Sequence, residues 1–169
     1  MHASIAVVVR PARPADVPLV VDLIRELAAY EKLSDECHAD VETLTEHLFG
    51  AKAYAEVLIG CFDGTPAGFA LFFHNYSTFL TKPGIYLEDL FVKPEYRDFG
   101  VGKALLTELA RIAVARGCGR LEWSVLEWNS PAIGFYLKLG AVPMEEWQVY
   151  RLTGEALQAL GAPPPAGAA

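Results

Sequence analysis

Residues 86–92 read YLEDLFV and residues 97–103 read RDFGVGK, and these two stretches carry most of the information about the fold. An apolar run followed by paired glycines and a helix-like pattern predicts a strand that turns into a helix. Gly100 and Gly102 let the backbone approach an anion closely, and N–H groups at a helix start point toward the same place. The stretch therefore predicts a phosphate-binding turn, although paired glycines can also serve only to turn the chain.

Two commoner phosphate-binding motifs do not fit these residues. A Walker loop requires glycine where the chain has Arg97, and serine or threonine where it has Ala104. A dinucleotide-binding fingerprint requires a third glycine at the position of Leu105. What remains is the pattern Arg-x-x-Gly-x-Gly directly after an apolar strand.

A second segment makes this pattern more specific. Residues 126–136 read LEWNSPAIGFY, and Gly140-Ala141 follow soon after. The loop and this segment together resemble the two acetyl-CoA-binding segments of the GNAT N-acetyltransferase superfamily. Within it the chain is most similar to the diamine acetyltransferases, the spermidine/spermine and thialysine N-acetyltransferase group, through residues 26–31, 86–92, 96–102 and 127–136.

One residue departs from the pattern of that group. The loop usually has glycine at the position that Asp98 occupies here. An acidic side chain beside a pyrophosphate is unfavourable unless it points to solvent. The aspartate therefore bears on the affinity for the cofactor more than on membership of the family.

The resemblance implies an α/β fold, a GNAT-type α/β sandwich with a mixed, mostly antiparallel central sheet flanked by helices. Apolar periodicity predicts strands at residues 5–10, 54–62, 67–73, 85–92, 119–126 and 147–152, and helices at 17–33, 41–50, 102–116 and from 131 onward. Asp63-Gly64 is expected to join two strands in a tight turn, and Asn129 or Ser130 to cap the last helix. We expect a single N-acetyltransferase domain over residues 5–160 and a flexible Pro/Ala/Gly-rich tail over residues 161–169.

Composition restricts the partners. Of the 169 residues 53% are hydrophobic, and 14 Lys and Arg against 21 Asp and Glu give a net charge of -7. This balance argues against nucleic acid and permits a cationic substrate, although acidity also simply keeps a protein in solution. The scattered cysteines and histidines predict neither a disulfide framework nor a metal site. Without a membrane-length apolar run or a signal-peptide pattern, we expect a cytoplasmic protein that binds no membrane.

Glu88 is the candidate base. Strand alternation is expected to place it with Tyr86 and Leu90 on one face, and Leu87, Asp89 and Phe91 on the other. A carboxylate at the mouth of a cleft could hold an ammonium group and accept its proton directly or through water. The alternative is an ordinary solvated strand residue, but charges are uncommon in the middle of an apolar strand.

Tyr136 is the candidate acid, since a phenol could give its proton to the departing thiolate. It follows Ala132 by four residues, so both share one helix face. On sequence alone Tyr136 is more simply a core aromatic residue, and its catalytic role is implied by the resemblance. Backbone N–H groups of Leu90, Phe91 and Val92, at the strand end, could stabilise negative charge on the thioester carbonyl.

The resemblance also implies a wider set of contacts. Expected to bind acetyl-CoA, the acetyl donor, are Leu90, Phe91, Val92, Arg97, Asp98, Phe99, Gly100, Val101, Gly102, Lys103, Asn129, Ser130, Pro131 and Ala132. Expected to contact the amine are Tyr30, Glu31, Glu88, Glu122, Trp123, Ser124, Glu145 and Glu146. Glu31 with Glu145 or Glu146 would hold the second, charged nitrogen of a diamine. A homodimer is expected from the same resemblance, with residues 147–152 as a contact.

The sequence thus predicts an acetyl-CoA-dependent N-acetyltransferase that needs no metal. Its acceptor would be a primary amine of a small molecule, either a polyamine or diamine or a lysine-like amino acid such as thialysine. The alternatives are another amine, a protein lysine or N-terminus, or a non-catalytic acyl-CoA-binding sensor. The presence of both Glu88 and Tyr136 favours the enzyme.

Overall fold

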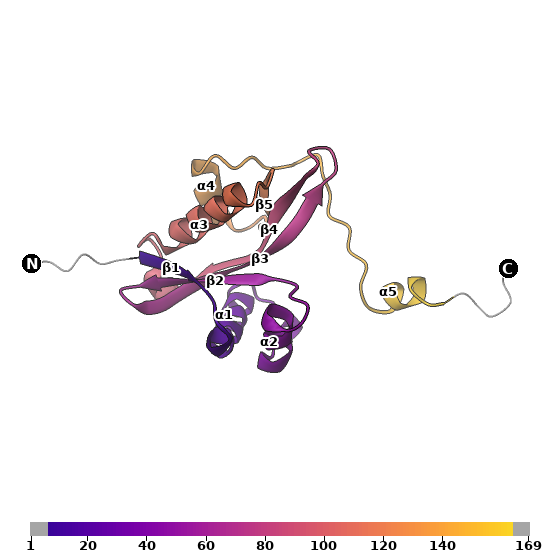
Figure 1. Cartoon of the computed structure of the whole chain (residues 1–169), viewed down its shortest axis with the longest axis horizontal. Helices are drawn as coiled ribbons and strands as arrows, with labels where there is room; N and C mark the ends of the chain where they lie inside the picture. Colours follow the sequence, from indigo (N-terminus) through magenta and orange to yellow (C-terminus); the bar gives the residue numbers. More distant parts are fainter. Residues whose placement is uncertain (1–6, 164–169) are drawn as a thin grey trace, which may run out of the picture. The chain divides into compact units, whose positions relative to one another are not determined.

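The sheet is built mainly from antiparallel hairpins. In the computed structural model, which describes residues 7–163, five strands form one sheet in the order β1-β2-β3-β4-β5 (Figure 1). They are β1 (Val7–Pro11), β2 (Glu56–Phe62), β3 (Thr65–Ser77), β4 (Lys82–Val92) and β5 (Leu121–Trp123). Strands β1 to β4 pair antiparallel, and β5 pairs parallel to β4. The predicted mixed, mostly antiparallel sheet is confirmed, and so is the turn at Asp63-Gly64 between β2 and β3.

Helices cover both faces of this sheet. Helices α1 (Val17–Tyr30) and α2 (Val41–Phe49) lie on one face, and α3 (Val101–Ala115) packs on the other across β1 to β4 (Figure 1). Short 3-10 turns occupy Pro14–Asp16, Ser34–Glu36 and Pro94–Tyr96. Helix α1 ends before the predicted residue 33 because Lys32 takes a φ of 61°, a left-handed conformation that stops a helix.

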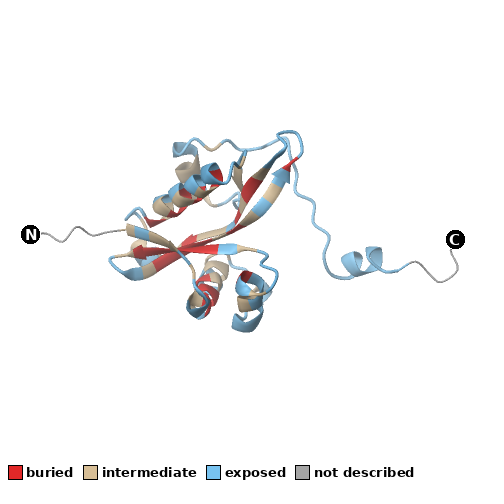
Figure 2. Cartoon of the chain, viewed as in Figure 1, coloured by how far each residue is buried: buried red, intermediate tan, exposed pale blue. Residues whose placement is uncertain are grey.

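The core lies where these layers meet (Figure 2). Between the sheet and the first two helices, Val20 and Leu23 of α1 pack with Ile59, Phe69 and Phe91 of the strands. On the other face α3 turns an apolar stripe inward, as its spacing predicts; its buried residues include Leu105, Leu109 and Ala113. Burying such side chains is the main stabilisation of the fold.

The chain divides into two compact units, residues 1–124 and 125–169. The second carries α4 (Ser130–Lys138) and α5 (Gly154–Leu160). Asn129 caps α4, since its side-chain oxygen accepts a hydrogen bond from the N–H of Ala132 at 3.4 Å. This confirms the predicted cap. The single-domain prediction for residues 5–160 stays a prediction.

Two strand predictions need correction. Residues 147–152, all within the described range, form no strand and are exposed, because β propensity makes a strand only where a neighbouring strand supplies hydrogen bonds. The strand predicted at 119–126 is reduced to the three residues of β5. Residues 5–6 of the first predicted strand and residues 164–169 of the predicted tail lie outside the described residues.

Candidate active site

A β-bulge interrupts β4 at Glu88. The pairing of β3 with β4 runs from Leu71↔Asp89 directly to Phe72↔Leu87, so the ladder skips Glu88. Phe72 lies beneath Arg116 near the end of α3, whereas Leu71 packs with the core under α1 and α2. Paired residues share a face, so Leu87 and Asp89 lie on opposite faces of the sheet. The simple alternation predicted for this strand is therefore wrong, because one extra residue shifts the pattern.

The bulge brings acidic side chains together. Glu88 is exposed, whereas Asp89 and Glu31, directly after α1, are partly buried. Burial raises the pKa of Asp89 to about 6, and the charges of Glu88 and Glu31 add to this rise. Burial alone raises the pKa of Glu31. Two predicted amine contacts, Glu31 and Glu88, thus both act on Asp89. Simple strand alternation would place Asp89 on the face of the sheet opposite to Glu88.

Asp89 carries a signal in the sequence. This signal is a second carboxylate next to Glu88 in the middle of an apolar strand. A regular strand would point the two side chains to opposite faces, so alternation conceals the signal. The register of β4 against β3 places Asp89 opposite Leu71, on the face that packs with α1, where burial and the charges of Glu88 and Glu31 raise its pKa.

Beyond the bulge one edge of β4 is open. Strand β5 pairs with β4 only at Ile85, Tyr86 and Leu87, and no other described strand pairs with that edge farther along. The predicted carbonyl-binding residues Leu90, Phe91 and Val92 lie in this part of β4. Backbone N–H groups that face an open edge can donate hydrogen bonds to a ligand.

The predicted phosphate loop has the backbone that anion binding requires. Gly100 precedes α3 with a φ of 88°, and no described side chain caps the helix there. The first N–H groups of α3 therefore point outward without a side-chain partner. A Cβ atom at Gly100 would meet nothing within 4 Å, and one at Gly102 would meet only Val92 Cγ2 at 3.6 Å. The loop is an open cradle whose dipole and N–H groups fit a pyrophosphate.

Asp98 has a φ of 66°, in the left-handed region. This conformation explains why the diamine acetyltransferases that the chain resembles have glycine at this position. Aspartate is among the few other residues that tolerate a left-handed φ angle. The Asp98 side chain is exposed.

Arg97 does not extend freely from this loop. Its Nε donates a hydrogen bond to the carbonyl oxygen of Val92 at 3.0 Å. Its guanidinium carbon lies 4.7 Å from the centre of the Tyr30 ring and 5.9 Å from that of Phe91. The side chain therefore contacts a predicted amine-binding residue, although the sequence placed Arg97 among the donor contacts.

Other predicted amine contacts on the first unit have structural partners. Glu122 pairs with Arg120 at 2.8 Å and accepts a hydrogen bond from the Asn75 amide at 2.9 Å. Ser124 shares a hydrogen bond of 2.8 Å with the hydroxyl of Tyr86. Trp123 is half-buried in β5. The charge of Glu122 is thus already neutralised, unlike that of the carboxylates around Asp89.

The remaining predicted residues belong to the second unit. Helix α4 carries Tyr136, whose ring centre lies 5.5 Å from that of Phe135, together with Ser130, Pro131 and Ala132. Asn129, Ala132 and Tyr136 are half-buried, while Glu145 and Glu146 are exposed. Helical spacing keeps Ala132 and Tyr136 on one face, as predicted.

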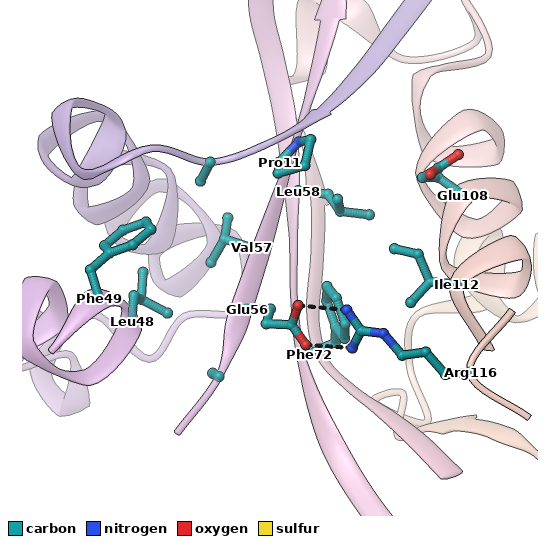
Figure 3. Close-up of a pocket in the computed structure, with 12 residues that line it drawn as sticks. Pro11, Leu48, Phe49, Glu56, Val57, Leu58, Phe72, Glu108, Ile112 and Arg116 are labelled. Carbon is teal, nitrogen blue, oxygen red and sulfur yellow. Dashed lines mark hydrogen bonds and ion pairs between the residues drawn. The ribbon is translucent and has the colours of Figure 1, made fainter. Parts of the chain in front are cut away.

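A cavity of about 450 Å³ lies elsewhere, between the end of α2, the start of β2 and α3 (Figure 3). Glu56 and Arg116 face each other in it as a bidentate pair, with distances of 2.6 and 2.8 Å. The pair lowers the pKa of Glu56. None of the predicted site residues lines this cavity.

Within residues 7–163 no group of His, Cys, Asp and Glu side chains has an arrangement that could hold a metal ion. None of the described helices is long and apolar enough to cross a membrane.

Comparison with known proteins identifies the family. Residues 22–141 match the acetyltransferase (GNAT) family. The chain belongs to this family. A thialysine N-epsilon-acetyltransferase from Bos taurus is 37% identical over 165 residues, which cover 91% of this chain and 96% of the relative. An L-ornithine N5-acetyltransferase from Arabidopsis thaliana is 34% identical, with 90% and 86% covered. This GNAT protein is thus an N-acetyltransferase that acts on amines.

Solved structures agree on the fold. An integron cassette protein from the mobile metagenome of V. cholerae superposes with a TM-score of 0.78 at 26% identity, covering 93% of this chain and 98% of that one. An aminoglycoside acetyltransferase from a soil metagenomic sample gives a TM-score of 0.70 at 20% identity, with 88% and 95% covered. The GNAT-type α/β fold predicted from the sequence is confirmed.

Proposed function

We propose that this GNAT enzyme transfers the acetyl group of acetyl-CoA to a primary amine of a small molecule that carries a second charged nitrogen. Such acceptors are diamines, polyamines and lysine-like amino acids such as ornithine and thialysine. The observation that carries the proposal is the set of Glu31, Glu88 and Asp89, the acidic cluster. Both charges that raise the pKa of Asp89 come from other carboxylates, so a cationic ligand would relieve their repulsion.

The donor half of the proposal rests on the loop before α3. Its left-handed Gly100, its uncapped helix start and the open space around Gly102 suit a pyrophosphate. Residues 98–103 would hold that group through backbone N–H groups, and the family resemblance adds Asn129, Ser130, Pro131 and Ala132 as donor contacts. When bound, acetyl-CoA supplies the activated acetyl group.

Each step of the proposed acetyl transfer is assigned to a particular side chain or backbone group. Glu88, directly or through water, would take the proton that the ammonium must lose before its nitrogen attacks the thioester carbonyl. Successive N–H groups of a strand point to alternate edges, so those among Leu90, Phe91 and Val92 that face the open edge of β4 would stabilise the negative charge on the carbonyl oxygen. Tyr136 would give a proton to the sulfur as the carbon–sulfur bond breaks.

A thiol-release assay with a panel of amines tests the proposal. Ornithine, thialysine and spermidine should exceed a butyl monoamine by about ten-fold or more in kcat/KM, because a charged contact is worth roughly 1 to 3 kcal/mol. The advantage should shrink as salt rises. Glu31→Gln should narrow it, whereas Glu42→Gln, at an exposed position of α2, should not. Equal values for the diamines and the monoamine in the unaltered enzyme would refute the proposed acceptor class.

A further inference from the structure

The segment that follows β4 contacts the last turn of α1 at two points. The guanidinium of Arg97 lies over the Tyr30 ring, with 4.7 Å between its carbon and the ring centre. Lys93 Nζ lies 3.6 Å from a carboxylate oxygen of Glu26. Glu26 and Tyr30 are four residues apart and lie on one face of the helix. Residues 93–97 therefore fix the end of α1 over one full turn.

Arg97 is anchored at both ends. Its Nε is hydrogen-bonded to the carbonyl of Val92, the last residue of β4, and its backbone N–H donates to the carbonyl of Pro94 at 3.2 Å. The guanidinium also lies 5.9 Å from the Phe91 ring. A planar cation held this way has little freedom, so the position of the Tyr30 ring is tied to the end of β4.

Tyr30 is connected directly to the acidic cluster. Glu31 is the next residue, and its N–H still donates to the carbonyl of Leu27 at 2.9 Å, so it continues the helical turn. Asp89 pairs with Leu71, which packs against the same core cluster as Leu27 and Tyr30, so Asp89 lies on the face of the sheet that the end of α1 covers. The charge of Glu31 accordingly adds to the rise in the pKa of Asp89. Because Tyr30 and Glu31 are consecutive in the last turn of α1, a shift of that turn would move Glu31 relative to Asp89.

We propose that Arg97 is a positioning residue for the acceptor. It holds the Tyr30 ring in place, and through Tyr30 it fixes the position of the Glu31 carboxylate relative to Asp89. Arg97 thereby connects the start of the donor loop to the amine site. The inference rests on the proposed function. It adds that the side chain of Arg97, in the donor loop, sets the preference for acceptors with a second charged nitrogen.

The test measures the ratio of kcat/KM for a diamine to that for the equally long alkyl monoamine. This ratio is unaffected by the fraction of folded enzyme and by equal losses of donor binding. Arg97→Met and Tyr30→Leu should each lower the ratio by about three- to ten-fold, the range expected for one cation–π contact. Combining them should cause less loss than the product of the two single losses, since both remove the contact between Arg97 and Tyr30.

Conservative variants and a surface control sharpen the result. Tyr30→Phe keeps the ring and should keep most of the ratio, and Arg97→Lys should restore part of what Arg97→Met loses. Arg111→Met removes an exposed arginine of α3 and should leave the ratio unchanged. In Arg97→Met, amide hydrogen exchange of residues 31–33 should become faster than in the unaltered enzyme.

Several outcomes overturn the inference. They are an unchanged ratio in Arg97→Met, additive losses in the double variant, and unchanged exchange at residues 31–33. Failure of the proposed function is different, since the unaltered enzyme would then show no preference for diamines. In that event the exchange measurement alone decides whether Arg97 positions the end of α1.

Discussion

Among single residues, Asp89 is the group whose chemistry the fold changes most. Burial, Glu88 and Glu31 raise its pKa to about 6 from an ordinary 3.8. The folded protein thus holds this proton more tightly than the unfolded chain does. Between about pH 4 and pH 6 the contribution of Asp89 to the free energy of unfolding therefore falls as pH rises.

Asp89→Asn should remove this penalty. At pH 7 the variant should unfold with a free energy about 2 to 3 kcal/mol higher than the unaltered protein, because two pKa units correspond to that energy. Below about pH 4 the carboxyl is protonated in both states, so the advantage should disappear. Urea unfolding at both pH values measures the difference, with the exposed Asp35→Asn as control. A difference that does not depend on pH would contradict the raised pKa.

Among the helices and strands, the start of α3 is set by its packing on β2. A Cβ atom at Gly60 would lie 2.8 Å from Val101 Cγ1, so glycine there lets the first turn of α3 approach the strand. The left-handed φ angles of Asp98 and Gly100 then turn the chain from η3 (Pro94–Tyr96) into the helix. The N–H groups of the loop are thereby held in one place before any ligand arrives, which lowers the cost of binding.

Gly102→Val should abolish detectable binding of acetyl-CoA, since a branched side chain would fill the open cradle. The fold should survive, because the nearest atom to a Cβ there is Val92 Cγ2 at 3.6 Å. Calorimetric titration measures the affinity and circular dichroism the fold. Asp98→Gly is the matched variant; it removes a negative charge and a left-handed aspartate, and should bind at least as tightly as the unaltered protein. Unchanged affinity in a folded Gly102→Val variant would remove the loop from the donor site.

Over the molecule as a whole, the C-terminal part carries unusually many exposed apolar side chains. Trp147, Val149 and Tyr150 are 76%, 83% and 89% exposed, and Leu160 of α5 is 78% exposed. Exposed apolar side chains indicate an interaction surface where they form one contiguous patch. The homodimer that the family resemblance implies, with the segment 147–152 as a contact, stays a prediction.

Light scattering at micromolar concentration should therefore give a mass of twice 18.4 kDa. Val149→Asp combined with Tyr150→Ser should shift the protein toward the monomer, because a charge placed in an apolar contact is costly. Val114→Asp, at an 81% exposed position of α3, should leave the mass unchanged. A monomer mass for the unaltered protein would remove the dimer.

The structural features that could be predicted from the sequence depend on residues that are close together along the chain. The spacing of Leu105 and Leu109 predicts the buried stripe of α3, and the glycines at 100 and 102 mark the loop before it. Asn129 is recognisable as a cap because its role involves residues three positions away. Such signals depend on helical periodicity and on allowed φ angles, both of which are local.

The interactions between distant segments could not be predicted in this way. The bulge at Glu88 depends on how β4 aligns with β3, and it places Asp89 and Leu87 on opposite faces where alternation would place them together. Glu122 has the appearance of a substrate contact in the sequence, but Arg120 and Asn75 bind it in the fold. Arg97 meets Tyr30 although 67 positions separate them along the chain. Register, desolvation and contacts between elements are properties of the packed chain, so no local pattern encodes them.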